Sequence, residues 1–196
     1  MSDPAKGKRR HYVISVMAWD RAGIVAGVSR AVASMDGDIA DMRQQVLRNY
    51  LTMIIYASFP SGVQGSQVAE RIRSLGGEGR DAFSVLVREI GDELPEEGST
   101  PGENLYVLTA EGPNRIGFVA GVAGFCAENG VNILDLFTTE AEDKDRYIMI
   151  LLVDTSRCPS IEGLRRNMEE FARDEGLNLV LQHYDIFRAT NEIRIF

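Results

Sequence analysis

The residues best suited to chemistry in this chain occur in two short turns, each followed by an apolar helical pattern. The first turn reads DRAGI (residues 20–24) and the second reads NRIGF (residues 114–118). The start of a helix presents unpaired backbone N–H groups and a partial positive charge, which suit a carboxylate. The Asp or Asn that opens each turn is able to accept a hydrogen bond from an ammonium group. An α-amino acid carries both of these groups.

A purely structural interpretation of the turns is also open. Asp and Asn are common helix caps, and Gly is a common turn residue. The beginning of the second strand in each copy, near residues 38–39 and 132–133, is expected to lie opposite the turn.

The two turns belong to a repeated unit. Residues 12–59 and 106–153 match at a constant offset of 94 without a gap, and VAGV recurs at 25–28 and 119–122. A repeat of this length predicts two small domains of the same fold with a pseudo-symmetric interface. Gly23/Gly27 and Gly117/Gly121 lie four residues apart on one helical face, which favours close packing of helix on sheet.

Hydrophobic periodicity predicts the order βαββαβ in each copy. The first copy has expected strands at 11–19, 39–48, 51–59 and 83–87 and helices at 22–35 and 68–75. The second has strands at 105–110, 132–140, 147–153 and 177–183 and helices at 116–128 and 161–174. The predicted class is α+β: two ferredoxin-like domains, each a four-stranded antiparallel sheet with two helices on one face. We expect domains at 11–90 and 105–184, a linker at 91–104 and a C-terminal tail at 185–196.

Signatures of catalysis are largely missing. The two histidines, His11 and His183, have no carboxylate at ligand spacing, and no CxxC, HExxH, GxSxG or P-loop pattern occurs. Acidic residues cluster at 140–145, where a solvated hairpin is the main interpretation and a divalent-ion or minor enzymatic site the alternative. The sequence thus predicts no enzymatic activity, no cofactor and no metal.

A nucleotide site is a weaker alternative. Strand 105–110, Gly112, Gly117, a helix and Asp135 imitate the start of a Rossmann unit. The glycines do not follow the G-x-G-x-x-G order, however, and a hairpin rather than a βα crossover follows Asp135.

Charge and composition exclude some partners. The net charge is −8, and residues 1–10 contribute +3, which leaves −11 on the rest. An acidic body repels phosphate, so no direct nucleic-acid partner is expected, and the basic terminus is predicted to be disordered.

No apolar run has signal-peptide or membrane-spanning length. Cys126 and Cys158 are expected to be free thiols of a reducing compartment, and the predicted location is cytoplasmic with no membrane partner.

The turns and the steps into the following strands resemble the ACT domain, a regulatory small-molecule-binding module. Those steps read GDI at 37–39 and GVNILD at 130–135. The resemblance covers nearly all of residues 11–184 and implies the βαββαβ fold. It also implies amino-acid binding at ACT–ACT interfaces, with the turn of one unit facing the second strand of another. The candidate binding residues carried over are Asp20, Arg21, Gly23, Ile24, Asp38, Ile39, Asn114, Arg115, Gly117, Phe118, Asn132 and Ile133.

Two positions depart from the family pattern: Asn114 stands in place of Asp, and Asp38 in place of Asn. Asp38 would repel a ligand carboxylate, so the second copy, with Asn132, is the favoured site. Phe118 is expected to narrow that site toward a small ligand, glycine or serine.

Two ACT units without a catalytic domain resemble the glycine cleavage system transcriptional repressor family. The resemblance implies a non-catalytic regulatory protein, a homodimer, that binds a small amino acid and signals to a regulatory protein partner in transcription regulation. The alternative is a ligand-free ACT dimerisation or scaffolding module, in which the glycines serve packing alone.

Overall fold

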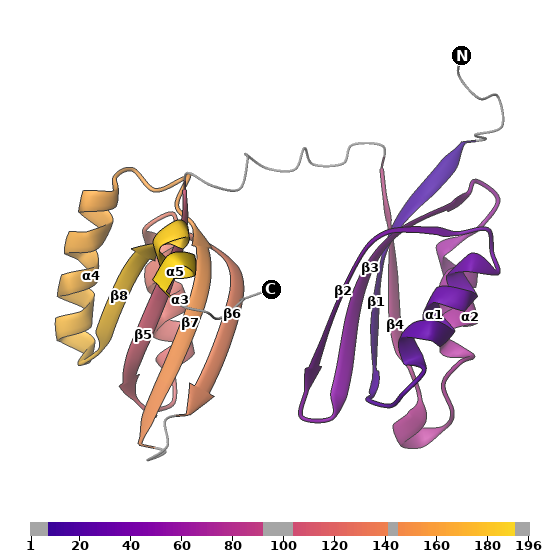
Figure 1. The fold of residues 1–196 in the computed structure, drawn as a ribbon, viewed down its shortest axis with the longest axis horizontal. Coiled ribbons are helices and arrows are strands. Elements are labelled where there is room, and N and C mark those ends of the chain that lie inside the picture. The colour runs from indigo at the N-terminus through magenta and orange to yellow at the C-terminus, as the bar shows by residue number, and fades with distance from the viewer. Residues whose placement is uncertain (1–7, 92–103, 141–144, 191–196) are drawn as a thin grey trace. The chain divides into compact units, whose positions relative to one another are not determined.

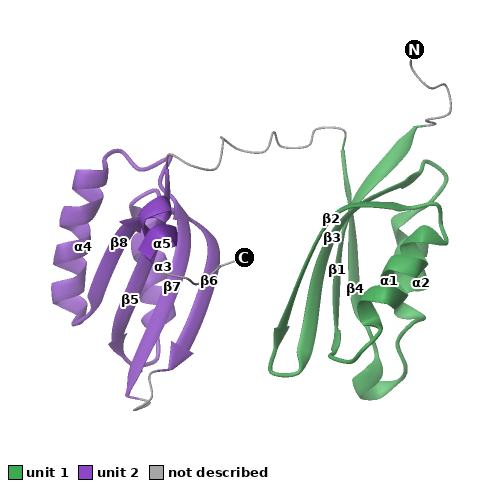
Figure 2. Ribbon diagram, viewed as in Figure 1, with its two compact units in different colours: residues 1–97 green, residues 98–196 purple. Residues whose placement is uncertain are grey.

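The computed structural model describes residues 8–91, 104–140 and 145–190. The chain divides into two compact units, residues 1–97 and residues 98–196 (Figure 2). The order of elements in each unit follows the repeat that the sequence contains, and each half forms its own four-stranded sheet.

The first unit has the order βαββαβ with one added short helical turn. Its elements are β1 (Arg9–Trp19), α1 (Ile24–Ala33), β2 (Asp38–Leu47), β3 (Tyr50–Pro60), α2 (Gly65–Arg73), η1 (Gly79–Asp81) and β4 (Ser84–Ile90). The sheet order is β2-β3-β1-β4 and every pairing is antiparallel. The 3₁₀ turn η1 was not predicted.

The second unit repeats this topology and adds a helix. Its elements are β5 (Leu105–Pro113), α3 (Phe118–Glu128), β6 (Asn132–Glu140), β7 (Arg146–Asp154), α4 (Ile161–Glu175), β8 (Asn178–His183) and α5 (Tyr184–Thr190) (Figure 1). The sheet order is β6-β7-β5-β8, again antiparallel throughout. The predicted fold class, two ferredoxin-like βαββαβ units, is confirmed.

Strand alternation builds the core of each unit. Between Tyr12 and Ala18 every second side chain of β1 is buried, including Ile14 and Val16, and the alternate residues Ser15 and Met17 are exposed. The buried face packs under α1 and α2 through side chains such as Val28. The sequence predicts a hairpin near residues 49–50 between the strands at 39–48 and 51–59. The structure confirms the hairpin between β2 and β3 and places its turn at Arg48 and Asn49. Both residues have positive φ, 47° and 67°, as a two-residue turn with right-handed twist requires. The corresponding predicted turn of the second unit lies mostly outside the described residues.

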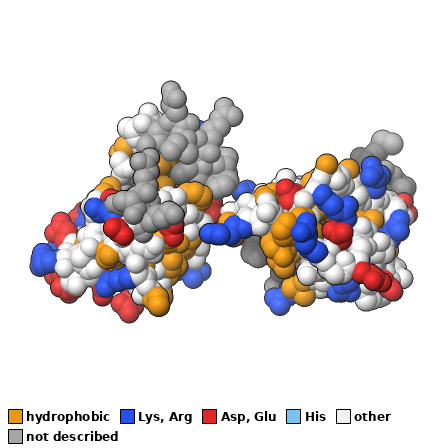
Figure 3. All heavy atoms as spheres, turned by 90° about the horizontal axis from the view of Figure 1, so that it is seen from below, with side chains coloured by type: hydrophobic (Ala, Val, Ile, Leu, Met, Phe, Trp, Pro, Cys, Tyr) orange, Lys and Arg blue, Asp and Glu red, His pale blue; other side chains and the backbone are white. Residues whose placement is uncertain are grey.

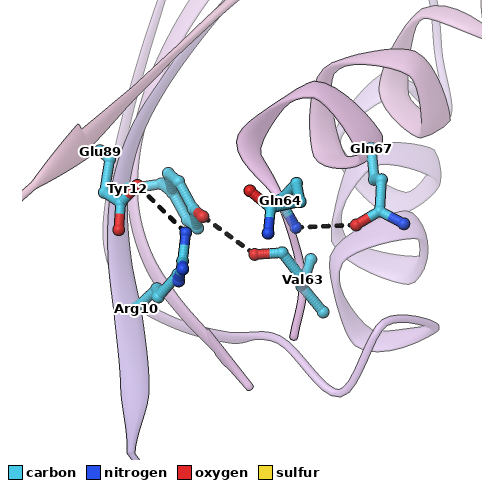
Figure 4. Close-up of polar contacts among 6 residues, drawn as sticks. All are labelled: Arg10, Tyr12, Val63, Gln64, Gln67 and Glu89. Atoms are coloured by element: carbon cyan, nitrogen blue, oxygen red, sulfur yellow. Dashed lines mark hydrogen bonds and ion pairs between the residues drawn. The ribbon is translucent and has the colours of Figure 1, made fainter. Parts of the chain in front are cut away.

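The start of α2 is fixed by polar contacts beside β1 (Figure 4). The Gln64 backbone N–H donates to Gln67 Oε1 at 2.7 Å, one half of a capping box. The Tyr12 hydroxyl donates to the Val63 carbonyl at 2.9 Å, which holds the preceding turn against the sheet. On the same strand, Arg10 forms an ion pair with Glu89 at 3.4 Å.

The basic segment at residues 8–10 is more ordered than the sequence predicts. Arg9 and Arg10 belong to β1, and Arg9 donates to the Ser58 side chain and to the carbonyls of Ser58 and Asp36. The prediction of a disordered terminus is therefore wrong for these two arginines, because each has partners on neighbouring strands or loops.

The helix α5 covers a sheet face that the first unit leaves open. It packs on β5 and β8 and buries Phe187 to 7% exposure. Val107, whose neighbours Leu108 and Ala110 face the α3–α4 core, is 1% exposed on the opposite face. At the equivalent position of the first unit, Val13 is only half-buried. The open face of the first sheet carries Met17, Leu47, Tyr50, Ile54 and Leu86, all exposed.

The two thiols are free and differ in burial. Cys126 is 1% exposed, and burial raises the pKa of its thiol from 9.0 to about 11. Cys158 is only half-buried. The reactive species is the thiolate, so Cys126 is the less reactive of the two.

We expect native protein to react with iodoacetamide at one thiol per chain at pH 8, and Cys158→Ser to remove that reaction. Cys126 should react only in denaturant, or slowly as the pH approaches 11. Because the folded thiol keeps its proton more tightly than the unfolded one, this site also stabilises the fold less as pH rises from 9 to 11. Mass spectrometry of the labelled protein measures both sites, and rapid labelling of Cys126 at pH 8 would contradict the prediction.

Candidate functional site

The two turns adopt the same backbone conformation. Gly23 and Gly117 are the helix N-caps, with φ of 92° and 91°. This left-handed conformation is easily reached only by glycine. A Cβ built on either glycine meets nothing within 4 Å, so the space beside each turn is open.

Both helices begin directly after a glycine. The N-cap residues are Gly23 for α1 and Gly117 for α3, so Asp20 and Asn114 do not occupy the helix-cap position that the structural interpretation gave them. The helices begin at Ile24 and Phe118, two residues later than predicted, because the left-handed glycine precedes them. Because glycine has no side chain, the N-cap residue itself supplies no side-chain acceptor for the first-turn amides of either helix.

The first turn is exposed and contacts other segments of its unit. The Asp20 backbone N–H donates to the Asn49 carbonyl at 2.8 Å. The Arg21 guanidinium lies 5.8 Å from the centre of the Phe83 ring, and among residues 8–91, 104–140 and 145–190 it forms no ion pair. Ile24 is 3% exposed and belongs to the core, so it supports the turn from beneath.

The second turn is tied to the end of α4. Arg115 Nη2 donates to the Glu175 carboxylate and, at 3.2 Å, to the Glu175 backbone carbonyl. Both side chains remain nearly half-exposed, at 47% and 43%. The Asn114 backbone N–H donates to the Asp145 carbonyl at 2.8 Å, and its side chain lies 3.5 Å from Glu140.

A cavity of about 260 Å³ lies beside the second turn, between the start of α3 and the end of α4; we call it the α3–α4 groove. It is lined by Arg115, Ile116, Gly117, Phe118, Gly121, Phe171, Glu175 and Leu177. Phe118 is 5% exposed, with its ring 5.5 Å from that of Tyr147. It forms a wall of the groove from within the core.

The second glycine of each pair faces a helix. A Cβ on Gly27 would lie 3.7 Å from Leu75, and one on Gly121 would lie 3.9 Å from Phe171. These are contacts with the segment at the end of the second helix of the unit. The expectation that the glycines serve close packing on the sheet is wrong, and in the second unit Gly121 instead keeps the groove wide.

The remaining candidates lie at the other end of each sheet. Asp38 pairs with Ser58, and Asn132 pairs with Asp154, which pairs with Leu105 at the start of β5. The turns follow the opposite ends of β1 and β5 (Figure 1). Within one unit the structure therefore does not bring the turn and the second-strand start together, and a site that uses both needs a turn and a strand from different units.

The second-strand starts share one irregularity. The pairing register shifts between Ile39 and Asp41 and, at the equivalent place, between Ile133 and Asp135. Such bulges re-aim side chains near the end of a strand. Asp38 and Asn132 are exposed, and Ile39 and Ile133 are half-buried against their cores.

The histidines have structural partners. His11 Nδ1 lies 2.8 Å from the Tyr56 hydroxyl, and His183 packs edge-on against Tyr106. Within the described part of the chain, no three His, Cys, Asp or Glu side chains group in a way that would hold a metal ion. Residues 141–144 of the acidic hairpin lie outside that part. No described helix has the length and apolar character needed to cross a membrane.

Five residues that line the groove were not predicted as binding residues: Ile116, Gly121, Phe171, Glu175 and Leu177. The last three lie far from the turn in sequence. The available signal was the length of the second helix in each copy. The helix α4 has 15 residues where α2 has 9, and this extension carries Glu175 to Arg115. Hydrophobic and charged side chains lie side by side on the surface of each unit (Figure 3).

Comparison with known proteins identifies the family. Models described as "ACT domain" match residues 10–78 and residues 106–162. A UPF0237 protein of Methanopyrus kandleri is 33% identical over 88 residues, 44% of this chain and 96% of that protein. One of Methanocaldococcus jannaschii is 34% identical over 88 residues, again 44% of this chain and 96% of the relative.

Solved structures share the fold of the whole chain. An unknown protein from Galdieria sulphuraria is 22% identical, with a TM-score of 0.70 over 90% of this chain and 99% of that one. A putative glycine cleavage system transcriptional repressor is 17% identical, with a TM-score of 0.61 over 89% of this chain and 96% of that one. The chain belongs to the ACT domain family and carries two of its domains in tandem.

Proposed function

We propose that this tandem ACT protein is a non-catalytic regulator that binds an α-amino acid between ACT units and signals to a protein partner. The ligand lies where the turn of one unit faces the second-strand start of another, and the second copy, with Asn132, is the main site. The protein acts in the cytoplasm as a homodimer, without direct contact with nucleic acid or membrane.

The observation that carries this proposal is the geometry of the turns. In both copies a left-handed glycine is the N-cap residue of a helix and lies two residues after an arginine. The backbone N–H groups of a first helical turn and a nearby guanidinium can both donate hydrogen bonds to a carboxylate. The open space around Gly23 and Gly117 leaves room for a ligand or for a strand of another unit.

Fold similarity to a putative glycine cleavage system transcriptional repressor supports a regulatory role without defining the partner. In the proposed mechanism, a ligand that bridges two units binds one arrangement of those units more tightly than another. It shifts their equilibrium by that difference in affinity. The changed arrangement is what the partner protein recognises.

Addition of the correct amino acid should raise the melting temperature in a concentration-dependent manner. A screen of the proteinogenic amino acids at millimolar levels, with glycine and serine among them, tests this by differential scanning fluorimetry. Asn132→Ala should abolish the rise while the circular dichroism spectrum stays unchanged. Asn178→Ala, which alters the exposed first residue of β8, is the matched control and should keep the full rise.

A ligand-free scaffold is the second candidate function. It is favoured by the exposed hydrophobic side chains on the open face of the first sheet, since exposed apolar patches mark interaction sites. Flat melting curves across all the amino acids would support this scaffold and contradict the sensor.

A further inference from the structure

Two side chains of opposite charge lie at the rim of the α3–α4 groove. Arg115 supplies one positive charge at its rim and Glu175 one negative charge, and the two are paired with each other. A ligand with only a carboxylate would be attracted by Arg115 and repelled by Glu175, and an amine would meet the reverse. A zwitterion satisfies both charges, because it exchanges one exposed ion pair for two.

That exchange is feasible because the Arg115–Glu175 pair is exposed. Ion pairs this accessible to water contribute little to stability, so opening this one costs the fold little. The Glu175 backbone carbonyl also lies at the rim, where Arg115 reaches it at 3.2 Å. The rim thus offers acceptors for an ammonium group as well as a donor for a carboxylate.

The lining of the groove is mixed. Phe118, Phe171 and Leu177 contribute apolar side chains beside the charged rim, and Gly121 contributes no side chain. Phe171 is held in place by stacking on Phe125, with ring centres 4.9 Å apart. The cavity of about 260 Å³ has the volume of about nine water molecules, more than the five heavy atoms of glycine need.

We propose that the α3–α4 groove receives the side chain of the bound amino acid, and that the ligand of the second unit has an apolar side chain of about the size of leucine. This inference rests on the proposed function and names a larger ligand than the glycine or serine expected from the sequence. Phe118 lines the groove with its ring 5.5 Å from that of Tyr147, and the cavity beside it is larger than glycine needs.

Isothermal titration of the full chain with glycine, serine, alanine and leucine tests the side-chain class. Burial of the four additional carbons of leucine in a half-open groove should make it bind at least tenfold more tightly than glycine. Two leucine fragments test the charge requirement: 4-methylpentanoate lacks the ammonium and 3-methylbutylamine lacks the carboxylate. Each should bind at least tenfold more weakly than leucine.

A substitution inside the groove supplies the structural control. Gly121→Leu places a side chain in the cavity, where the Cβ itself has only an ordinary contact of 3.9 Å with Phe171. It should weaken leucine binding at least tenfold and leave glycine binding nearly unchanged. Gly124→Leu makes the same change on the same helix outside the groove and should bind leucine as the native protein does.

The outcomes separate the two proposals. If glycine or serine binds as tightly as leucine, or if Gly121→Leu and Gly124→Leu bind leucine equally, the groove assignment is wrong and the proposed function stands. If no amino acid binds at all, the proposed function fails together with the groove assignment.

Discussion

Replacement of Phe187 by alanine is expected to lower the free energy of unfolding of the second unit by about 3 kcal/mol. Phe187 is 7% exposed on α5, which packs on β5 and β8. The loss has two physical parts: the phenyl ring no longer leaves water on folding, and a cavity remains over the sheet face that carries Val107. The alanine variant should also expose Val107 to solvent.

The matched control is the neighbouring residue. Ile186 is 56% exposed on the same helix, so Ile186→Ala should change stability by less than about 0.5 kcal/mol. Urea denaturation followed by circular dichroism measures both variants. Trp19, the single tryptophan, lies in the first unit, and its fluorescence should show an unchanged midpoint for that unit. Equal destabilisation by the two variants would mean that α5 does not cover the sheet.

The sheets were predictable because their signal is local. Strands such as β1 alternate buried and exposed side chains, and the 94-residue repeat allowed each copy to support the assignment in the other. A hairpin was predicted near residues 49–50, one residue from the turn observed at Arg48 and Asn49. These features depend on neighbours in sequence, so pattern alone locates them.

Helix starts and the last helix were harder to predict. The apolar spacing of α1 begins near residue 22, but a positive φ at Gly23 delays the helix, and hydrophobic periodicity carries no information about φ. The helix α5 has seven residues, which is under two full turns. Its stability comes from packing of Phe187 on a distant sheet face, as is usual for short helices.

The part of the site that is contiguous in sequence was predicted, and the part that depends on distant residues was not. The turns themselves are contiguous in sequence, and both have the glycine conformation that a close approach requires. Their partners are not contiguous: Arg115 meets Glu175 across 60 residues, whereas Arg21 lies over Phe83. The turns of the two copies thus have the same backbone conformation but contact different side chains. A comparison of the turn sequences alone does not reveal this difference.

A large loss of ligand affinity is expected from Arg115→Gln. A hydrogen bond to a charged group contributes about 1.5–3 kcal/mol, so loss of the guanidinium should weaken amino-acid binding to the second unit by about 10-fold to 100-fold. Without ligand the melting temperature should hardly change, because the Arg115–Glu175 pair is exposed. Isothermal titration and thermal unfolding of the same preparation measure the two effects.

Arg146→Gln is the matched control for this variant. Arg146 pairs with Glu111 at 3.1 Å and is 49% exposed, close to the 47% of Arg115. It lies outside the groove, so its loss should leave ligand affinity unchanged. Arg21→Gln should act only on binding to the first unit, where no carboxylate among the described residues competes for the guanidinium. Unchanged affinity in Arg115→Gln would show that the ligand carboxylate does not bind at the second turn.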